Sequence, residues 1–551
     1  METDKNSEDV SNVLGMVLAG SLTEGVRIKL ASDVSTEQIK VGTFVSIRGE
    51  LMRFFGVVTD VSLDSMDSSL TSIPPDVTNP FIHEVVSGTT VYGTLTVEPM
   101  LTLGDDKDPT SSLEGPLPAK TVPAHFAEVS IASETDIEFI FGKEDESHFY
   151  IGTPLDMETK LCLDVKELVK RSNGVFGKSG TGKTFLTRLL LIGILQNSAA
   201  VNLVFDMHSE YGWKGSSEDN KEVKGLKQLF SSKVAVFSLD EESSRRRGLT
   251  PDYVVKIGYG EIEPEDIQLL RETMGLSEVA AESSYNLRQR LGPQWLRDFL
   301  NLKSEQLLEL AQEISVNERA LSTLHNRLSR LKRFDFINES DKNDSVKQLL
   351  HYLERGMHVV LEFGRYGNSL AAYILVANIL TRRIHDRYVY LKDRSSVDGI
   401  GEPRPVVITI EEAHKFLTPG IAGQTIFGSI AREMRKYNVT LLVVDQRPSG
   451  IDEEVMSQLG TKITCLLDSE RDVNSVLSGV SGSRKLRSVL SRLESKQQAL
   501  AFGDALPMPV VIRTREYGSS ESYRELGWKD DRELAQQVKS DVEDLFGPDT
   551  S

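Results

Sequence analysis

A glycine-rich segment carries the clearest chemistry in the sequence. It fits the pattern G-x-x-x-x-G-K-[ST], with a short apolar run before it and a leucine-rich run after it, and reads Gly177-Lys178-Ser179-Gly180-Thr181-Gly182-Lys183-Thr184. In such loops the backbone N–H groups surround phosphate oxygens at a helix N-terminus. Lys183 is then expected to reach the β- and γ-phosphates, and the hydroxyl of Thr184 to hold Mg²⁺. The pattern therefore predicts a nucleoside triphosphate site rather than a chance glycine turn.

Two adjacent carboxylates follow an apolar run further along the chain. Val406–Ile410 ends at Glu411 and Glu412. In P-loop ATPases the first acid after such a strand helps to bind Mg²⁺, and the next polarises the attacking water. Adjacent strand residues point in opposite directions, so both can serve one site only where the strand ends. We assign Glu411 to the metal and Glu412 to the general base; the alternative is a solvated acidic loop.

Polar residues beside the next apolar run, Thr440–Val444, are further candidates. Gln446 follows that run and could contact a γ-phosphate or the attacking water. Arg432 and Arg435 precede it, and either could reach the γ-phosphate of a neighbouring subunit. The alternative for both arginines is an ordinary solvated helix face.

Two more polar groups have both a functional and a structural interpretation. Asp206, His208 and Glu210 follow the apolar run Val201–Phe205 at alternate positions, which places them on one side of an extended chain at the carboxyl edge of a sheet. Metal or water coordination is one interpretation, but we favour an ordinary hydrogen-bonded loop. The basic triplet Arg245–Arg247, expected in a loop, either faces DNA phosphates or balances the acidic residues just before it.

The residue composition and the hydrophobic pattern change along the chain, and these changes predict its domains. Short alternating runs with many glycines indicate a small β-barrel, and apolar β-branched runs between helices indicate an α/β core with a parallel sheet. A stretch rich in Leu, Arg, Glu and Gln predicts a helical subdomain inserted into that core. The expected segments are a disordered tail (1–12), the barrel (13–150, with a loop at Asp105–Pro118), the first part of the core (151–260), the helical insertion (261–345), the second part of the core (346–515) and a C-terminal arm (516–551), helical over Asp530–Leu545.

Composition limits the classes of function. The 551 residues include 63 basic and 82 acidic side chains, a formal net charge of −19, which disfavours nonspecific coating of nucleic acid or of anionic membrane. DNA would have to be handled through a local basic lining, such as the pore of a ring. The two cysteines, Cys162 and Cys465, lie in apolar runs, and no apolar run approaches the ~20 residues that span a bilayer. We expect a cytoplasmic protein that does not enter a membrane.

Five blocks in this order resemble the HerA family. HerA proteins are ring-forming DNA translocases related to FtsK, within the RecA-like class of P-loop ATPases. The phosphate loop alone is shared by many proteins, whereas the Glu-Glu-Ala-His and Gln-Arg-Pro-Ser blocks together are far more specific. The blocks are Gly177–Thr184, Phe205–Tyr211, Ile410–Phe416, Ala431–Tyr437 and Asp445–Ser449.

This resemblance implies a fold, an activity and partners. The fold is a RecA-like P-loop core with an N-terminal small β-barrel of the HAS-barrel kind and an inserted helical subdomain. Six copies form a ring, and hydrolysis of ATP with Mg²⁺ at the subunit interfaces drives double-stranded DNA through the central pore. The usual partner of the family is the NurA nuclease, with DNA end resection as the shared task. Some bacterial relatives instead join other effectors in anti-phage defence, so a ring that scaffolds and activates such an effector is the alternative.

The resemblance also carries roles onto particular residues. Lys183 and Thr184 bind nucleotide and Mg²⁺, and Glu411 and Glu412 form the acidic pair. Gln446 senses the γ-phosphate. The remaining candidates are arginines: Arg435 or Arg432 as the finger that acts on a neighbouring subunit, and Arg171, upstream of the phosphate loop, as a further contact to nucleotide.

Overall fold

The structure is a computed structural model that describes most of the chain. Contacts divide the chain into two compact units. The first, here the barrel unit, comprises Met1–Lys183, Asp445–Ser449 and Met456–Arg515; the second, the insertion unit, comprises Thr184–Val444, Gly450–Val455 and Glu516–Ser551. The described residues are 13–66, 78–79, 90–104, 115–216, 222–338, 345–398, 401–419, 422, 425–480 and 482–529.

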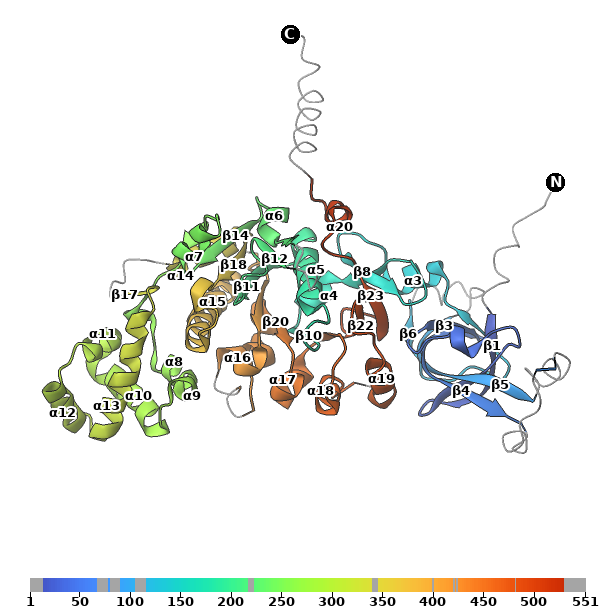
Figure 1. Ribbon diagram of the computed structural model, residues 1–551, viewed down its shortest axis with the longest axis horizontal. Coiled ribbons are helices and arrows are strands. Elements are labelled where there is room, and N and C mark those ends of the chain that lie inside the picture. Colours follow the sequence, from blue (N-terminus) through green and yellow to red (C-terminus); the bar gives the residue numbers. More distant parts are fainter. Residues whose placement is uncertain are drawn as a thin grey trace, which may run out of the picture. The chain divides into compact units, whose positions relative to one another are not determined.

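The barrel unit begins with a closed antiparallel barrel (Figure 1). Its strands follow the order β2-β1-β7-β3-β4-β5, and pairing of β2 with β5 closes the ring. Alternate apolar side chains fill the interior, among them Val45, Ile47 and Val97, each with 0% of its surface exposed. The predicted barrel is therefore confirmed. The strands are β1 (Val13–Ser21), β2 (Gly25–Leu30), β3 (Phe44–Arg48), β4 (Met52–Ser65), β5 (Val91–Gly104) and β7 (Glu128–Ile131), with β6 (Leu117–Pro118) paired outside the ring.

The barrel unit also contains the strand that leads into the glycine-rich loop. That strand, β10 (Asn173–Phe176), pairs in parallel with β21 (Thr461–Thr464), and antiparallel strands continue in the order β22-β23-β8-β9. Helix α19 (Ser483–Leu490) contacts the barrel, where Ser488 Oγ donates to the Thr59 carbonyl at 2.9 Å. The other elements are α3 (Glu134–Phe141), β8 (His148–Pro154), β9 (Leu161–Asp164), α4 (Val165–Val169), α18 (Glu470–Val476), β22 (Gln498–Gly503) and β23 (Val510–Thr514).

The insertion unit is built on parallel strands in the order β15-β14-β18-β11-β19-β20. From β14 to β20 their side chains are buried on both faces, as expected of a parallel sheet between layers of helices. The strands are β11 (Val201–Asp206), β14 (Val234–Ser238), β15 (Tyr253–Val254), β18 (His358–Glu362), β19 (Val406–Glu411) and β20 (Val439–Asp445). The helices are α5 (Lys183–Gln196), α6 (Leu226–Leu229), α14 (Ser345–Glu354), α15 (Leu370–Asp398) and α16 (Ile426–Glu433), and a hairpin is formed by β12 (Lys214–Ser216) and β13 (Glu222–Lys224).

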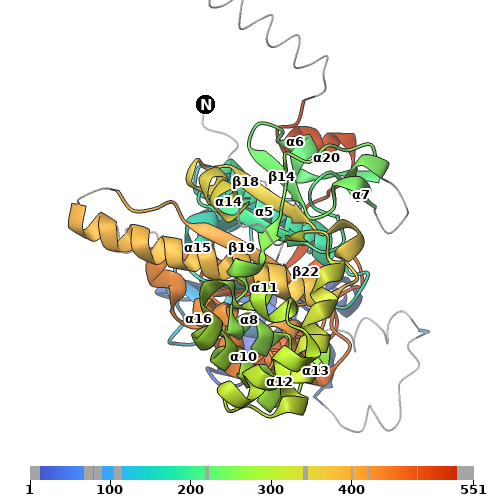
Figure 2. The same ribbon diagram turned by 90° about the vertical axis from the view of Figure 1, so that its left-hand side faces the viewer.

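A group of helices is inserted between β15 and α14 and forms its own cluster (Figures 1 and 2). Trp295 is fully buried at its centre, and its indole N–H donates to the Ile262 carbonyl at 3.0 Å. The chain enters and leaves through two short parallel strands, β16 (Ile257–Gly258) and β17 (Ile337–Asn338). The predicted fold class, α/β with a barrel and a helical insertion, is thus confirmed. The helices are α8 (Pro264–Leu269), α9 (Arg271–Met274), α10 (Glu278–Leu291), α11 (Trp295–Leu300), α12 (Ser304–Glu313) and α13 (Glu318–Leu328).

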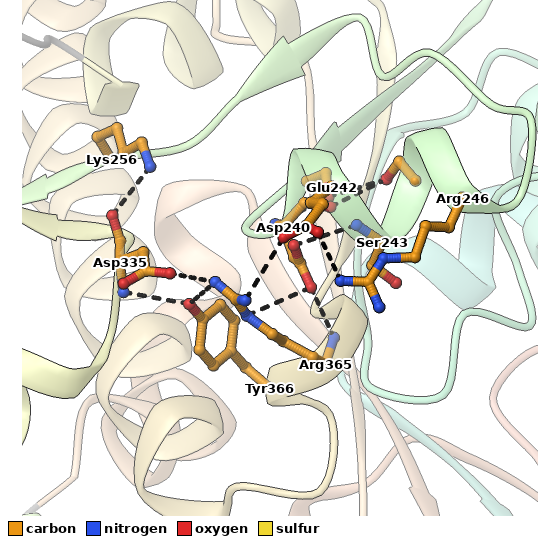
Figure 3. Close-up of polar contacts among 10 residues, drawn as sticks. Asp240, Glu242, Ser243, Arg246, Lys256, Asp335, Arg365 and Tyr366 are labelled. Carbon is orange, nitrogen blue, oxygen red and sulfur yellow. Dashed lines mark hydrogen bonds and ion pairs between the residues drawn. The ribbon is translucent and has the colours of Figure 1, made fainter.

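Polar contacts join this helical insertion to the strand ends of the sheet (Figure 3). Arg365, just after β18, donates to the Asp335 carboxylate and to the Tyr366 hydroxyl. Its backbone N–H donates to Asp240 Oδ2 at 3.1 Å, and Lys256 Nζ donates to the Asp335 carbonyl at 2.9 Å. Asp240 and Tyr366 are buried, whereas the side chains of Arg365 and Asp335 are 44% and 66% exposed, so the exposed ion pair alone contributes little. The base of the insertion is therefore tied to the sheet.

The basic triplet Arg245–Arg247 was expected in a loop, and this prediction is wrong. Its first two residues end helix α7 (Glu241–Arg246), and each pairs with a glutamate four residues earlier, Arg245 with Glu241 and Arg246 with Glu242. Arg247 instead pairs with the fully buried Glu362. Opposite charges at this spacing face each other on a helix, so Arg245 and Arg246 balance their acidic neighbours, whereas Arg247 balances Glu362.

Several predicted segments lie partly or wholly outside the described residues. These are the tail 1–12, most of the loop Asp105–Pro118 and the helix Asp530–Leu545. Within the described C-terminal part, α20 (Ser520–Glu525) is a single short helix. Among the helices that the structure describes, none has the length and apolar character needed to cross a membrane.

One buried histidine gives a prediction about acid stability. His358 opens β18, and its Nδ1 accepts a hydrogen bond from the Asn202 backbone N–H at 3.1 Å. Burial, with Lys233 and Arg404 nearby, lowers the pKa of His358 to about 3. Its contribution to stability is full above the unfolded pKa of about 6.5 and is lost as pH falls toward the folded value. In His358→Asn the amide oxygen can accept the same bond but does not titrate.

We therefore expect the wild-type free energy of unfolding to fall by about 0.8 kcal/mol more than that of His358→Asn between pH 7.5 and pH 6. Urea titrations of both proteins measure this difference. Parallel pH profiles would contradict the assignment of a neutral, buried imidazole.

Candidate nucleotide site

The glycine-rich loop joins β10 to α5, and its backbone adopts conformations that are easily accessible to glycine. Gly180 and Gly182 have φ values of 78° and 93°, in the left-handed region that favours glycine. A Cβ on Gly177 would lie 2.8 Å from both Cys465 Cβ and Thr181 Oγ1. A Cβ on Gly182 would have no atom within 4 Å. Gly177 is therefore required for packing of the loop itself, whereas Gly182 faces open space.

Hydrogen bonds within the barrel unit hold this loop in a curl. The backbone N–H of Lys178 donates to the Leu466 carbonyl at 3.0 Å, and Thr181 Oγ1 donates to the Lys178 carbonyl at 2.8 Å. Lys183 Nζ donates to the same Lys178 carbonyl at 2.7 Å, which places the ammonium inside the curl. A compact cation beside a curl of backbone N–H groups is suited to bind phosphate oxygens.

Two ion pairs involve basic residues in the loop or just before it. Lys178 Nζ is 2.9 Å from Asp468 Oδ1, at the turn that follows β21. Arg171, the upstream candidate, precedes β10, and its Nε is 2.9 Å from Asp504 Oδ2. All four side chains are about one third or more exposed, so neither pair prevents rearrangement around a ligand. Thr184 lies in the first turn of α5.

The acidic pair lies at the end of β19 in the insertion unit. Glu411 is the last residue of the strand and is buried; its Oε1 accepts a hydrogen bond from Tyr211 Oη at 2.8 Å. The Tyr373 hydroxyl accepts from the Glu411 backbone N–H and donates to its carbonyl, both at 3.1 Å. Burial, reinforced by repulsion from Asp206, raises the pKa of Glu411 to about 8. The buried Glu411 Oε2 has no hydrogen-bond partner among the described residues.

Glu412 has a different environment from Glu411. Its φ of 48° lies in the left-handed region, which is uncommon for a residue with a side chain and ends the strand. One carboxylate oxygen is 3.6 Å from His414 Nδ1, and the side chain is 30% exposed. The structure thus separates one buried and one accessible carboxylate at a single strand end, as a metal ligand and a general base require.

Asp206 organises the turn after β11. It is fully buried, and its two oxygens accept the backbone N–H groups of Glu210, Tyr211 and Gly212 at 2.8, 2.8 and 3.2 Å. Ser209 has a φ of 58°, so the predicted extended run from Asp206 to Glu210 is wrong and His208 is carried into a turn. The favoured interpretation, a hydrogen-bonded loop, describes this segment. Burial outweighs these hydrogen bonds and raises the pKa of Asp206.

The remaining candidates have different surroundings. Gln446 is exposed directly after β20. Arg432, near the end of α16, has Nη1 3.7 Å from Glu454 Oε2 and donates from Nη2 to the Ala422 carbonyl at 3.4 Å. Arg435 lies in the 3-10 turn Met434–Tyr437, and its side chain is outside what the structure describes.

Sequence reasoning missed the tyrosines that hold Glu411. Tyr211 and Tyr373 are both fully buried and come from separate elements, the turn after β11 and helix α15. A buried tyrosine is ordinary in an apolar helix, so the sequence around Tyr373 did not indicate a contact with Glu411. Tyr211 ends the block Phe205–Tyr211, next to Glu210, and this position was the indication in the sequence that it belongs to the site.

The parallel sheet, the strand–loop–helix turn around Gly177–Thr184 and the acids at the end of β19 define a P-loop nucleoside-triphosphatase. Residues 149–384 match the family described as "Helicase HerA, central domain". The predicted resemblance to the HerA family is thereby confirmed.

Individual relatives extend this resemblance over more of the chain. The chain is 24% identical to the DNA double-strand break repair helicase HerA of Pyrococcus furiosus over 69% of its own length and 71% of the relative's. It is 22% identical to HerA of Saccharolobus solfataricus over 91% of this chain and 92% of that one. A solved structure of the bacterial conjugative coupling protein TrwB covers 70% of this chain and 93% of its own, with a TM-score of 0.45 and 12% identity.

Two glycine substitutions separate the binding role of the loop from its structural role. Gly182→Ala places a methyl group in open space, so we expect a loss of stability of only about 1 kcal/mol, from its positive φ. The same methyl group would add bulk to a loop that is proposed to bind phosphate through its backbone N–H groups, so affinity for a fluorescent ATP analogue should fall at least about tenfold. Gly177→Ala meets Cys465 and should cost about 1–3 kcal/mol of stability. Unchanged nucleotide affinity in Gly182→Ala would contradict this assignment.

Proposed function

We propose that this protein is an ATP-driven DNA translocase of the HerA type. The observation that carries the proposal is the presence, in one chain that resembles HerA helicases, of a complete phosphate loop, Gly177–Thr184, and of one buried and one accessible acid, Glu411 and Glu412. Relatives named as DNA double-strand break repair helicases support duplex DNA as the substrate on which the motor acts.

The residues fit ATP with Mg²⁺. Gly182 faces open space and Lys183 Nζ already lies in the curl. Glu411 Oε2, which has no hydrogen-bond partner among the described residues, is the kind of oxygen that a hard cation takes. Thr184 and Glu411 would hold Mg²⁺, which neutralises phosphate charge when bound. Because the pKa of Glu411 is about 8 in its present surroundings, binding of a cation there must displace a proton at neutral pH.

The chemical step then requires a base that can exchange protons with water. Glu412 is partly exposed and follows the strand directly, so it takes a proton from the attacking water while Lys183 stabilises the phosphate oxygens. Gln446 contacts the γ-phosphate or that water. Arg171 contributes a further contact to the nucleotide once it leaves Asp504.

Ring assembly is the second part of the proposal. Six copies surround duplex DNA, and Arg432 or Arg435 of one copy completes the nucleotide site of the next. Arg432 reaches Glu454 only at 3.7 Å, a weak ion pair that a γ-phosphate would replace. Because the net charge is −19, contact with DNA must depend on a local basic lining of the pore. A nuclease of the NurA kind is the partner that fits end resection.

ATP turnover with and without duplex DNA tests this function. At low salt we expect duplex DNA to stimulate the wild-type rate, and Glu412→Gln to lower the stimulated rate by about 100-fold or more through loss of the general base. The variant should still bind ATP and DNA, whereas Lys183→Ala should lose affinity for ATP.

A wild-type rate that is the same with and without DNA would contradict the translocase. The alternative, a ring that scaffolds and activates an effector nuclease in anti-phage defence, predicts a different result in the same experiment. Activation of the effector would then survive Glu412→Gln, because binding alone would be sufficient.

A further inference from the structure

A buried arginine lies behind the acidic strand end. Arg188 projects from α5, the helix that follows the phosphate loop, and only 1% of its surface is exposed. Its Nη2 donates to the Glu210 carbonyl, and its Nε and Nη1 have no hydrogen-bond partner among the described residues. A buried cation without a carboxylate partner is costly and needs another source of stabilisation.

Three aromatic rings supply that stabilisation. The Arg188 guanidinium carbon is 5.3, 5.9 and 5.5 Å from the ring centres of Phe185, Tyr211 and Tyr517, within the range of cation–π attraction. The hairpin β12–β13 closes the remaining side, because a Cβ on Gly215 would lie 2.2 Å from Arg188 Nη2. The guanidinium is thereby fixed in one position.

The third ring comes from the segment that follows β23. The hydroxyl of Tyr517 donates to the Lys224 carbonyl, and the Tyr523 hydroxyl accepts from the Lys224 N–H at 2.8 Å. Further along, Gln196 Nε2, in the last turn of α5, donates to the Leu526 carbonyl at 2.8 Å. This C-terminal segment, residues 517–526, therefore packs along the same helix that carries Arg188.

Tyr211 links the aromatic cage, which is formed by the rings of Phe185, Tyr211 and Tyr517 around Arg188, to Glu411. Its ring is one wall of the cage, and its hydroxyl donates to Glu411 Oε1 at 2.8 Å. Backbone hydrogen bonds to Asp206 fix the position of Tyr211 in the chain. With Oε1 held in this way, the other oxygen of Glu411, Oε2, has no hydrogen-bond partner within the part of the chain that the structure describes.

We propose that Tyr211 is a positioning residue for Glu411, and that Arg188 and Tyr517 hold Tyr211 in place. The inference rests on the proposed ATP hydrolysis, in which Glu411 holds Mg²⁺. The Tyr211 hydroxyl fixes the rotation of the carboxylate so that Oε2 faces the cation. Because the cage includes Tyr517, the C-terminal segment contributes to the affinity of the acid for metal without touching it.

Hydrolysis measured against Mg²⁺ concentration tests the proposal. Tyr211→Phe keeps the ring in the cage and removes only the hydroxyl, so we expect the Mg²⁺ concentration for half-maximal turnover to rise by about 10-fold or more. The KM for ATP at saturating Mg²⁺ should change little, and the melting temperature should fall by no more than the loss of one buried hydrogen bond allows. Tyr388→Phe removes the hydroxyl of another buried tyrosine of the insertion unit and should leave the Mg²⁺ dependence unchanged.

Two variants at Tyr517 test the cage. Tyr517→Phe retains the aromatic wall and should match wild type, whereas Tyr517→Ala should shift the Mg²⁺ dependence in the same direction as Tyr211→Phe. A wild-type protein that does not hydrolyse ATP would refute the proposed function. Normal wild-type hydrolysis with the same Mg²⁺ dependence in Tyr211→Phe and Tyr388→Phe would overturn this inference alone.

Discussion

Glu411 is a carboxylate buried at the end of a parallel strand, and the polar contacts around it in the insertion unit depend on this constraint. A carboxylate in such a place must be hydrogen-bonded or neutral, because its charged form loses the stabilisation of water. The fold supplies Tyr211 for one oxygen and Tyr373 for the backbone, from two separate elements of the unit. The raised pKa of Glu411 shows that burial still disfavours its charged form, and a bound cation would stabilise that form.

The same constraint accounts for polar groups that appear unrelated in the sequence. Asp206 uses both oxygens to form the turn that presents Tyr211, and Arg188 holds the ring of that tyrosine. Glu362, at the end of β18, is also fully buried and pairs with Arg247; its burial raises its pKa to about 7. Asp206, Glu362 and Glu411 at the carboxyl edge of the sheet are therefore each held by a particular partner.

Local pattern was enough to predict the fold class and the strand–loop–helix turn, whereas the roles of the candidate site residues stay predictions. Alternation predicted the barrel strands, and Gly177–Thr184 predicted the strand–loop–helix turn, because both depend on neighbours in sequence. Long-range partners were not predictable: Tyr373 is 38 residues from Glu411, and Tyr211 is 200. The extended run at Asp206 failed because an aspartate that caps three N–H groups turns the chain, and spacing alone does not reveal such a turn.

The central claim is that copies of this chain form a ring that moves duplex DNA. Electron microscopy of the full chain with ATP, Mg²⁺ and a blunt duplex tests this claim most directly. The account predicts particles with six copies around a central opening, with duplex density passing through it and nucleotide density between adjacent copies. Single copies, or rings with DNA bound only on the outer surface, would contradict it.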